Sequence, residues 1–315
     1  MKQTKKITWV LAHEPYDLFL RAAEFFSKTV SEKTNGAIEI EVMDCPTWEN
    51  KYNNGVKIDR YKMLDLVNAG VIDMSQMYTT TLGQLDKDMY VLDMPFIFSG
   101  HDHAARILDG EVGKSLFAGL EAKTNVKGLA YTYSGGFRAI VGNEVISTLE
   151  QFAGMKVRVA NCPVAEDTFR AVGAEPVVIA IEKLAKAIGE NQVDLGESTY
   201  PRIYSMGQNE VSTVINHTEH SLFLTSIILN KKLWATLDAE TQQIFADAAI
   251  AAAKIERSES LDDIVAVQTR AKQDGIKISY LSDTERARFI DATAKVYDQY
   301  QDYFTPGLIT KVKEG

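Results

Sequence analysis

The sequence predicts an α/β protein with two lobes, and three observations support this fold class. The chain has 315 residues, of which 45% are hydrophobic, and this is enough apolar material for two separate cores. Strand patterns alternate with helix patterns from residue 7 to residue 74, and the alternation begins again near residue 156. A third segment, 238–274, contains neither proline nor glycine and is rich in alanine, which favours a long helix.

The periodicity of apolar residues places the elements of the first half. Ile38, Ile40 and Val42 alternate with glutamates, which is typical of a strand with one buried face. The predicted order is strand 7–12, helix 17–34, strand 37–42, a polar aromatic loop 44–55, helix 58–69 and strand 71–74. Strands that alternate with helices in this way form mostly parallel sheets.

The second half repeats the scheme. Its predicted elements are strand 156–160, helix 163–172, strand 176–179, helix 181–189 and strand 193–195. The segment 238–274 fits either one helix, about 55 Å long, or two helices that break near residues 258–260. A single helix of that length would brace both lobes.

The composition restricts the function classes. A net charge of −9 argues against general affinity for nucleic acid or for anionic membranes. The chain has no apolar run long enough to span a bilayer. The apolar run 7–11 is too short for a signal peptide, so we expect either a cytoplasmic protein or one whose leader is absent from this chain. Two cysteines, Cys45 and Cys162, exclude a disulfide framework, and their pairing with each other stays open.

Several motifs imitate catalytic or cofactor sites without meeting their requirements. The segment 110–115 resembles a phosphate-binding loop, but the position of its first glycine is held by Leu108. The pairs His101/His103 and His217/His220 lack the spacing of a zinc site and have no evident third ligand, so we interpret them as polar loop histidines. We therefore expect no cofactor, no metal and no catalytic site.

Two arginines stand in apolar segments that favour strands. Arg158 shares one face of strand 156–160 with Lys156, and Arg138 lies twenty residues earlier, in segment 135–141. A buried guanidinium needs an anionic partner, and its planar fork matches a carboxylate. The two arginines therefore indicate a carboxylate-binding pocket. The alternative is that both form ordinary structural salt bridges, and the residues alone do not decide between these interpretations.

Tyrosines at or just beyond predicted strand ends provide a second indication of a pocket. In parallel α/β sheets these ends border ligand crevices, where a tyrosine can both wall a pocket and hydrogen-bond a polar ligand. The alternative is that they are ordinary half-buried aromatic residues. The five are Tyr78, Tyr131, Tyr133, Tyr200 and Tyr204.

A series of motifs resembles the substrate-binding subunits of tripartite ATP-independent periplasmic (TRAP) transporters, the DctP-like family. In chain order they are AAEFF (22–26) with TNGAIEI (34–40), NAGVID (68–73), LDMPFIF (92–98), GMKVRV (154–159) and VDLGE (193–197). Each motif alone is loose, but their order and spacing are specific, and they cover nearly the whole chain.

The resemblance implies a type II periplasmic-binding-protein fold. In this fold two α/β lobes, joined by crossing strands and a long hinge-spanning helix, close over a small organic acid. We expect lobe I to comprise residues 1–134 and about 222–264. We expect lobe II to comprise residues 135–221 and about 265–315.

The resemblance also implies roles for individual residues. In this family the arginine of the GMKVRV-type motif forms a salt bridge with the ligand carboxylate, and this role carries over to Arg158. A second arginine about twenty residues upstream often assists, and Arg138 fills that place. The residue after the VDLGE-type motif commonly contacts the ligand as asparagine, and here it is Ser198.

The chain departs from the sialic-acid binders of the family. Tyr78 and Thr81 stand where those proteins have an acid and an arginine, so the resemblance does not extend to a sialic-acid ligand. Trp48 and Tyr78 favour a less charged or more apolar body beside the carboxylate. The remaining predicted binding residues are His13, Asn161, Ile181 and Tyr200.

We therefore expect a periplasmic solute receptor without enzymatic activity. It would bind a small organic acid or sugar acid as a monomer and deliver it to the large and small TRAP membrane subunits. Three alternatives remain: a receptor for an ATP-driven importer, a two-lobe cytoplasmic enzyme, and a ligand sensor for a signalling partner.

Overall fold

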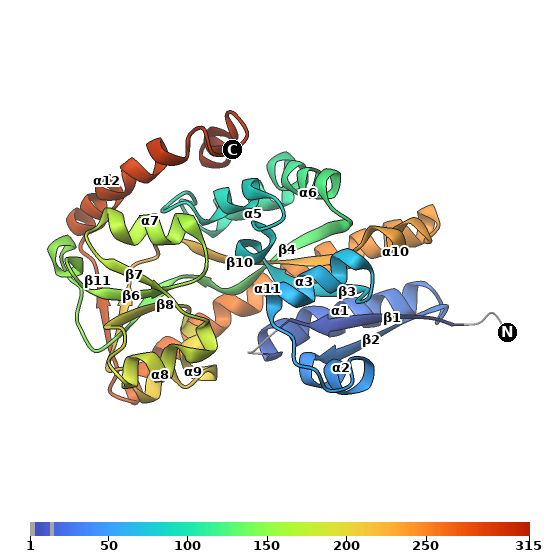
Figure 1. Cartoon of the computed structure of the whole chain (residues 1–315), viewed down its shortest axis with the longest axis horizontal. Coiled ribbons are helices and arrows are strands. Elements are labelled where there is room, and N and C mark those ends of the chain that lie inside the picture. The colour runs from blue at the N-terminus through green and yellow to red at the C-terminus, as the bar shows by residue number, and fades with distance from the viewer. Residues whose placement is uncertain (1–3, 13–15) are drawn as a thin grey trace. The chain divides into compact units, whose positions relative to one another are not determined.

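The chain, described by a computed structural model over residues 4–12 and 16–315, divides into two compact units. Unit 1 takes the chain up to Asp86, then Ala105–Ser134 and Leu224–Glu259. Unit 2 takes Lys87–Ala104, Gly135–Phe223 and Ser260–Gly315. In Figure 1 the blue N-terminal elements therefore belong to unit 1 and the red C-terminal elements to unit 2.

Residues 87–104 lie in unit 2, although the expected boundaries place them in lobe I. Within this unit the Tyr297 hydroxyl donates a hydrogen bond to the carbonyl of Pro95 at 2.7 Å. The ring of Phe96 packs edge-on against Phe289, with 5.2 Å between their centroids. These contacts fix the segment to the C-terminal helices, which have no recognisable link to it in the sequence.

The sheet of unit 1 has five strands in the order β2-β1-β3-β10-β4. β1 pairs in parallel with β2 and β3, whereas β10 runs antiparallel to β3. The strands are β1 (Lys5–Leu11), β2 (Ile38–Asp44), β3 (Met74–Tyr78), β4 (Val126–Phe137) and β10 (Leu222–Asn230). The helices within this unit are α1 (Tyr16–Lys33), α2 (Cys45–Tyr52), α3 (Arg60–Ala69), α4 (Thr79–Leu82), α6 (Glu111–Lys123) and α10 (Lys231–Ala235).

The sheet of unit 2 has six strands in the order β11-β9-β5-β8-β6-β7. β6 is parallel to β7 and β8, and β5 is antiparallel to β8 and β9. The strands are β5 (Ala139–Gly142), β6 (Lys156–Val159), β7 (Glu175–Val178), β8 (Leu195–Ser198), β9 (Val214–His217) and β11 (Lys277–Tyr280). The α-helices are α7 (Pro163–Ala171), α8 (Leu184–Gly189), α9 (Tyr200–Ser205), α12 (Asp283–Tyr300) and α13 (Leu308–Glu314). Four 3₁₀-helices are η1 (Lys87–Asp93), η2 (Leu149–Phe152), η3 (Ile181–Lys183) and η4 (Gln208–Glu210).

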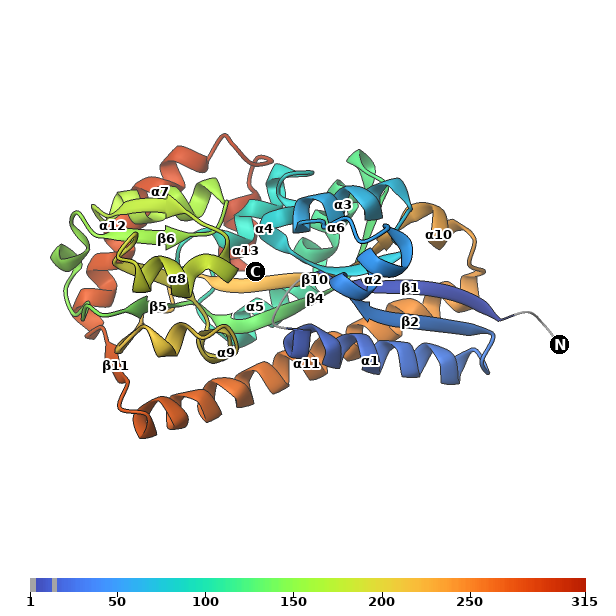
Figure 2. The ribbon, with the colours of Figure 1, turned by 60° about the horizontal axis from the view of Figure 1, so that its bottom comes forward.

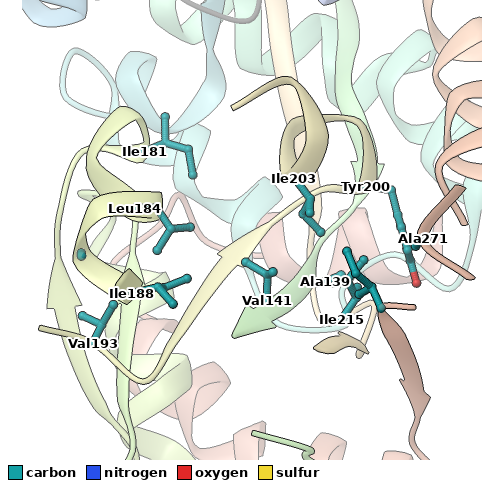
Figure 3. Packing of buried hydrophobic residues seen from close by; sticks show 12 residues of the cluster. Ala139, Val141, Ile181, Leu184, Ile188, Val193, Tyr200, Ile203, Ile215 and Ala271 are labelled. Carbon is teal, nitrogen blue, oxygen red and sulfur yellow. The ribbon is translucent and has the colours of Figure 1, made fainter. Parts of the chain in front are cut away.

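One hydrophobic cluster of unit 2 packs helices against this sheet. Figure 3 shows the cluster, with Ile181 and Leu184 on the side of α8 and Tyr200 beside Ala271 of α11. Val141 of β5 and Ile215 of β9 supply the sheet side of the cluster. The cluster therefore fixes the segments that follow β7 and β8, where the predicted binding residues lie.

Segment 238–274 forms one helix, α11 (Ala239–Gln273), and not two. Figure 2 shows it as a continuous orange helix. No proline or glycine interrupts it. Ser260, at the position of the expected break, is a residue of this helix and is completely buried. The boundary between the units falls at residues 259/260, so both units include part of α11. Helix α5 (His101–Asp109) also has residues in both units.

Three local predictions were wrong, and one of them is the strand expected at 193–195, since β8 spans Leu195–Ser198. The expected loop 44–55 contains helix α2, because Asp44 caps it by accepting a hydrogen bond from the Thr47 amide at 2.7 Å, and Pro46 stands in its first turn. The strand expected at 71–74 begins only at Met74. Gly70 ends α3 in the left-handed conformation, and the amide of Val71 still donates to the carbonyl of Leu66.

Across the described residues, none of the helices combines the length and the apolar character needed to cross a bilayer.

Aromatic packing joins α11 to the sheet of unit 1. Phe26 of α1 lies edge-on to Phe245 of α11 and to Trp9 of β1, with 5.3 Å between ring centroids in each pair. All three side chains are fully buried. We expect Phe245→Ala to lower the free energy of unfolding by about 3–5 kcal/mol, because it leaves a cavity between helix and sheet. Urea unfolding followed by tryptophan fluorescence measures this change.

Ile250 provides the matched control on the same helix, since 43% of its surface is exposed. Ile250→Ala should change the free energy of unfolding by less than about 1 kcal/mol. Equal effects of the two substitutions would contradict the assignment of Phe245 to the core.

Candidate functional site

Arg158 lies on β6, between β7 and β8, and only 3% of its surface is exposed. Its Nε donates a hydrogen bond to the carbonyl oxygen of Ile179 at 2.6 Å. Its Nη1 donates to the carbonyl oxygen of Glu197 at 3.1 Å. Carbonyl oxygens orient a guanidinium without carrying a net charge. The main chain of β8 and the residue that follows β7 therefore fix Arg158.

Arg138 stands between β4 and β5 and forms internal ion pairs. Its Nη1 lies 3.0 Å from Oε1 of Glu197, and its Nη2 lies 3.3 Å from Oδ1 of Asp93. The guanidinium also stacks on the ring of Phe223, 3.9 Å from the centroid. With 2% of its surface exposed, Arg138 fits the structural salt-bridge interpretation. Its predicted contact with a ligand stays a prediction.

Glu197 connects the two arginines. Its carboxylate pairs with Arg138 and accepts a hydrogen bond from the amide of Ala160 at 3.1 Å, while its carbonyl binds Arg158. Its Oε2 lies 3.4 Å from Nε2 of His220. Burial raises the pKa of Glu197, but Arg138 and His220 outweigh burial and lower this pKa to about 2. Glu197 is therefore an anion in the folded protein.

His220 is a buried residue and not the polar loop histidine that we expected. Its Nδ1 lies 2.8 Å from Oγ1 of Thr218, and 1% of its surface is exposed. Burial lowers its pKa, which favours the neutral ring. His220 and the ion pairs border a cavity of about 10 Å³, room for roughly one water molecule and too little for an organic acid. The cavity is lined by Asp93, Arg138, Ala165, Thr168, Phe169, Glu197, His220 and Ser221.

Ser198 and Asn161 lie at the ends of the strands that carry Glu197 and Arg158. Ser198 ends β8 and is 1% exposed, and its Oγ has no hydrogen-bond partner in the described part of the chain. A buried hydroxyl without a partner is costly, so this oxygen is suited to a further hydrogen bond. Asn161 is exposed just beyond β6. Both remain predicted ligand contacts.

Tyr200 and Ile181 belong to the hydrophobic cluster of unit 2 (Figure 3). The Tyr200 hydroxyl lies 2.8 Å from Nδ1 of His217, and burial raises its pKa. Ile181 is 3% exposed. The structure therefore gives both side chains a packing role, while their predicted contact with a ligand remains a prediction.

Two predicted residues lie in unit 1. Trp48 is 3% exposed on α2, and its ring lies 6.4 Å from that of Tyr52. Tyr78 is completely buried at the end of β3, edge-on to Phe19 at 5.9 Å. Contact of either residue with a ligand stays a prediction, and His13 lies outside the described residues.

The sequence analysis missed the roles of Asp93, Glu197 and His220. Asp93 and Glu197 stand inside the LDMPFIF and VDLGE motifs, and for Asp93 the signal was an acid in an otherwise apolar run. Such an acid needs a buried cation, and Arg138 was available. His220 gave no comparable signal, because its neighbours in the sequence are polar.

Over residues 4–12 and 16–315, no group of three or more His, Cys, Asp or Glu side chains is arranged to hold a metal ion.

Comparison with known proteins identifies the family. A family model described as bacterial extracellular solute-binding protein, family 7 (DctP), matches residues 12–302. The C4-dicarboxylate-binding protein DctB of Bacillus subtilis is 28% identical over 301 residues, which cover 93% of this chain and 81% of that protein.

Two solved structures have the same fold. A TRAP periplasmic solute-binding protein from Chromohalobacter salexigens, with bound D-glucuronate, has a TM-score of 0.87 and 25% identity, covering 98% of this chain and 99% of that one. A TRAP protein from Polaromonas sp., bound to D-erythronate, has a TM-score of 0.87 and 25% identity, with 99% of both chains covered. These likenesses confirm the predicted fold class. Together with the match over residues 12–302, they confirm the resemblance found in the sequence: this chain belongs to family 7 of the bacterial extracellular solute-binding proteins.

Proposed function

We propose that this protein is a solute receptor that binds a small organic acid or sugar acid and delivers it to TRAP membrane subunits. The observation that carries the proposal is Arg158, a buried guanidinium on β6 that two main-chain carbonyls hold. In a family of solute-binding proteins, such a group is suited to pair with a ligand carboxylate.

The names of the relatives support a carboxylate ligand. D-Glucuronate and D-erythronate, the ligands of the two solved relatives, carry one carboxylate each, and the Bacillus relative is named for dicarboxylates. Each hydrogen bond to a charged group contributes ~1.5–3 kcal/mol, so three or four would supply much of the ~8 kcal/mol of micromolar binding. Arg158 and the hydroxyl of Ser198 are the donors that we assign to the ligand.

The receptor acts outside the cytoplasm, as a monomer, and catalyses no reaction. The two solved relatives are TRAP receptors, which favours this transporter class over an ATP-driven importer. Membership of a solute-binding family favours a receptor over a two-lobe enzyme.

Mass spectrometry of co-purifying small molecules, followed by a thermal-shift panel of organic acids, tests the proposal. A ligand that binds only the folded protein raises its melting temperature by mass action. A panel of C4-dicarboxylates, hexuronates and aldonates in which no compound raises the melting temperature would contradict the proposal.

We expect Arg158→Lys to weaken binding of the acid identified in that panel by about 100-fold. One ammonium group cannot bind the carbonyls of Ile179 and Glu197 and also present a planar pair of donors to a carboxylate. Isothermal titration calorimetry measures the affinity.

The control is Arg170→Lys in the same unit. Arg170 pairs with Glu166 and Asp167 on α7, and 54% of its side chain is exposed. Its replacement should leave the affinity within about twofold of the wild type. Wild-type affinity in the Arg158 variant would refute the role of this residue.

We expect Glu197→Gln to lower the free energy of unfolding by about 3 kcal/mol at neutral pH, because Arg138 loses its closest carboxylate. The lowered pKa of Glu197 also sets a pH dependence. The contribution of its ionised form is complete above its usual pKa of 4.5 and is lost as the pH falls toward about 2. The difference between variant and wild type should therefore narrow in acid, which denaturant unfolding at several pH values measures.

Glu166→Gln removes an acid from the surface pair with Arg170 and serves as the control. It should cost less than about 1 kcal/mol, since exposed pairs are well solvated. A Glu197 variant as stable as this control would contradict the stabilising role of the ion pair between Glu197 and Arg138.

A further inference from the structure

Asp93 is a buried acid that the proposed ligand contact does not use. It ends η1 and is 5% exposed, and its Oδ1 lies 3.3 Å from Nη2 of Arg138. Its Oδ2 is buried and has no hydrogen-bond partner in the described part of the chain. An ionised carboxylate with an unbonded oxygen is costly in such a place, and a neutral acid is much less so.

A ligand carboxylate at Arg158 would add a negative charge to the buried charged groups that surround Asp93. Arg138 and Arg158 are cations, Glu197 is an anion and the ring of His220 is neutral. With Asp93 ionised these five groups sum to zero, so a ligand carboxylate would bring their sum to −1, which disfavours the ionised form of Asp93. With Asp93 protonated they sum to +1, and a ligand carboxylate brings this sum to zero.

We propose that Asp93 takes up a proton from water when an organic acid binds at Arg158, so that unit 2 accepts a single carboxylate and binds it more weakly as the pH rises. This inference rests on the proposed function. The proton enters the carboxylate of Asp93, which becomes a neutral acid, and no other bond changes. The unit thereby distinguishes a monoanionic group from a dianionic one.

The surroundings of Asp93 favour titration near neutral pH. Burial raises its pKa and Glu197 raises it further, while Arg138 opposes them, and the result is about 7. Arg138, Glu197 and the ring of His220 line the small cavity with Asp93, and Cys162, at the start of α7, is close enough to interact with it electrostatically.

The other charged side chains on η1, and on the helices α7 and α13 that pack against it, have other partners or are exposed. Those of α7 form a pair network at the surface, those of α13 are exposed, and Asp88 of η1 accepts hydrogen bonds from Thr305. In full, these side chains are Glu166, Asp167 and Arg170 on α7, Lys311, Lys313 and Glu314 on α13, and Lys87 and Asp88 on η1.

Calorimetric titration of the full chain with D-glucuronate, D-galacturonate, D-erythronate and succinate tests the proposal. Buffers of different ionisation enthalpy report the protons taken up on binding. For an acid that binds, we expect uptake that approaches one proton near pH 8 and affinity about five- to tenfold weaker there than near pH 6.5. Binding without proton uptake would overturn this inference and leave the proposed function intact. Failure of all four acids to bind between about pH 6 and 8 would overturn both.

Asp93→Asn imitates the neutral acid and cannot ionise. It should bind with the affinity of the wild type near pH 6, without pH dependence and without proton uptake. His220→Gln is the control for the other titratable group of the cavity and should keep the pH dependence. A pH-dependent Asp93 variant, or a pH-independent His220 variant, would overturn the assignment. If the Asp93 variant does not fold, infrared spectroscopy of the ligand-free wild type provides the test. The band of a protonated carboxyl group should be present near pH 6 and should disappear by about pH 8. A spectrum without this band at pH 6, or with a band that does not change, would overturn the inference.

Discussion

The buried ion pair between Arg138 and Glu197 is the interaction on which the candidate site depends. Neither side chain is more than 2% exposed, so the charge of each is stable only in the presence of the other. The same residue, Glu197, then offers its carbonyl to Arg158. Any movement of Glu197 to preserve its pairing with Arg138 would also move the acceptor that holds Arg158. The geometry of Arg158, the arginine that we propose binds the ligand, is therefore linked to the ion pair between Arg138 and Glu197.

The strand order of unit 2 explains how this arrangement arises. β8 lies between β5 and β6, with Ala139 opposite Ser198 on one side and Arg158 opposite Gly196 on the other. Arg138, one residue before β5, and Arg158, within β6, are consequently both next to Glu197. Residues far apart in the sequence become neighbours because one short strand has an antiparallel partner on one side and a parallel partner on the other.

Local sequence patterns allowed much of the secondary structure to be predicted, but they did not show which residues lie opposite one another in the sheets. The alternation in 38–42 correctly indicated a strand. The segment 238–274, which has no proline or glycine, left a single long helix as one of two options, and the structure has the single helix. The sequence also identified Arg138 and Arg158 as unusual. It did not separate their roles, because the separation depends on which arginine lies beside Asp93 and Glu197. That depends on strand register, which a period-2 pattern leaves open. Helix α2 was missed because its cap, Asp44, also suits a turn.

A buried network of this kind is a poor way to stabilise a sheet. Apolar residues of similar volume are often as stabilising as a buried ion pair or more so, and they leave no unpaired oxygen such as Oδ2 of Asp93. An apolar replacement would also remove the acid that pairs with Arg138 and the titratable group that we propose adjusts the local charge. A receptor for acids must hold a guanidinium in place before the anion arrives, and carbonyl partners orient it without carrying a net charge. Carbonyls of Ile179 and Glu197 bind Arg158 in this way, while the carboxylates of Asp93 and Glu197 pair with Arg138.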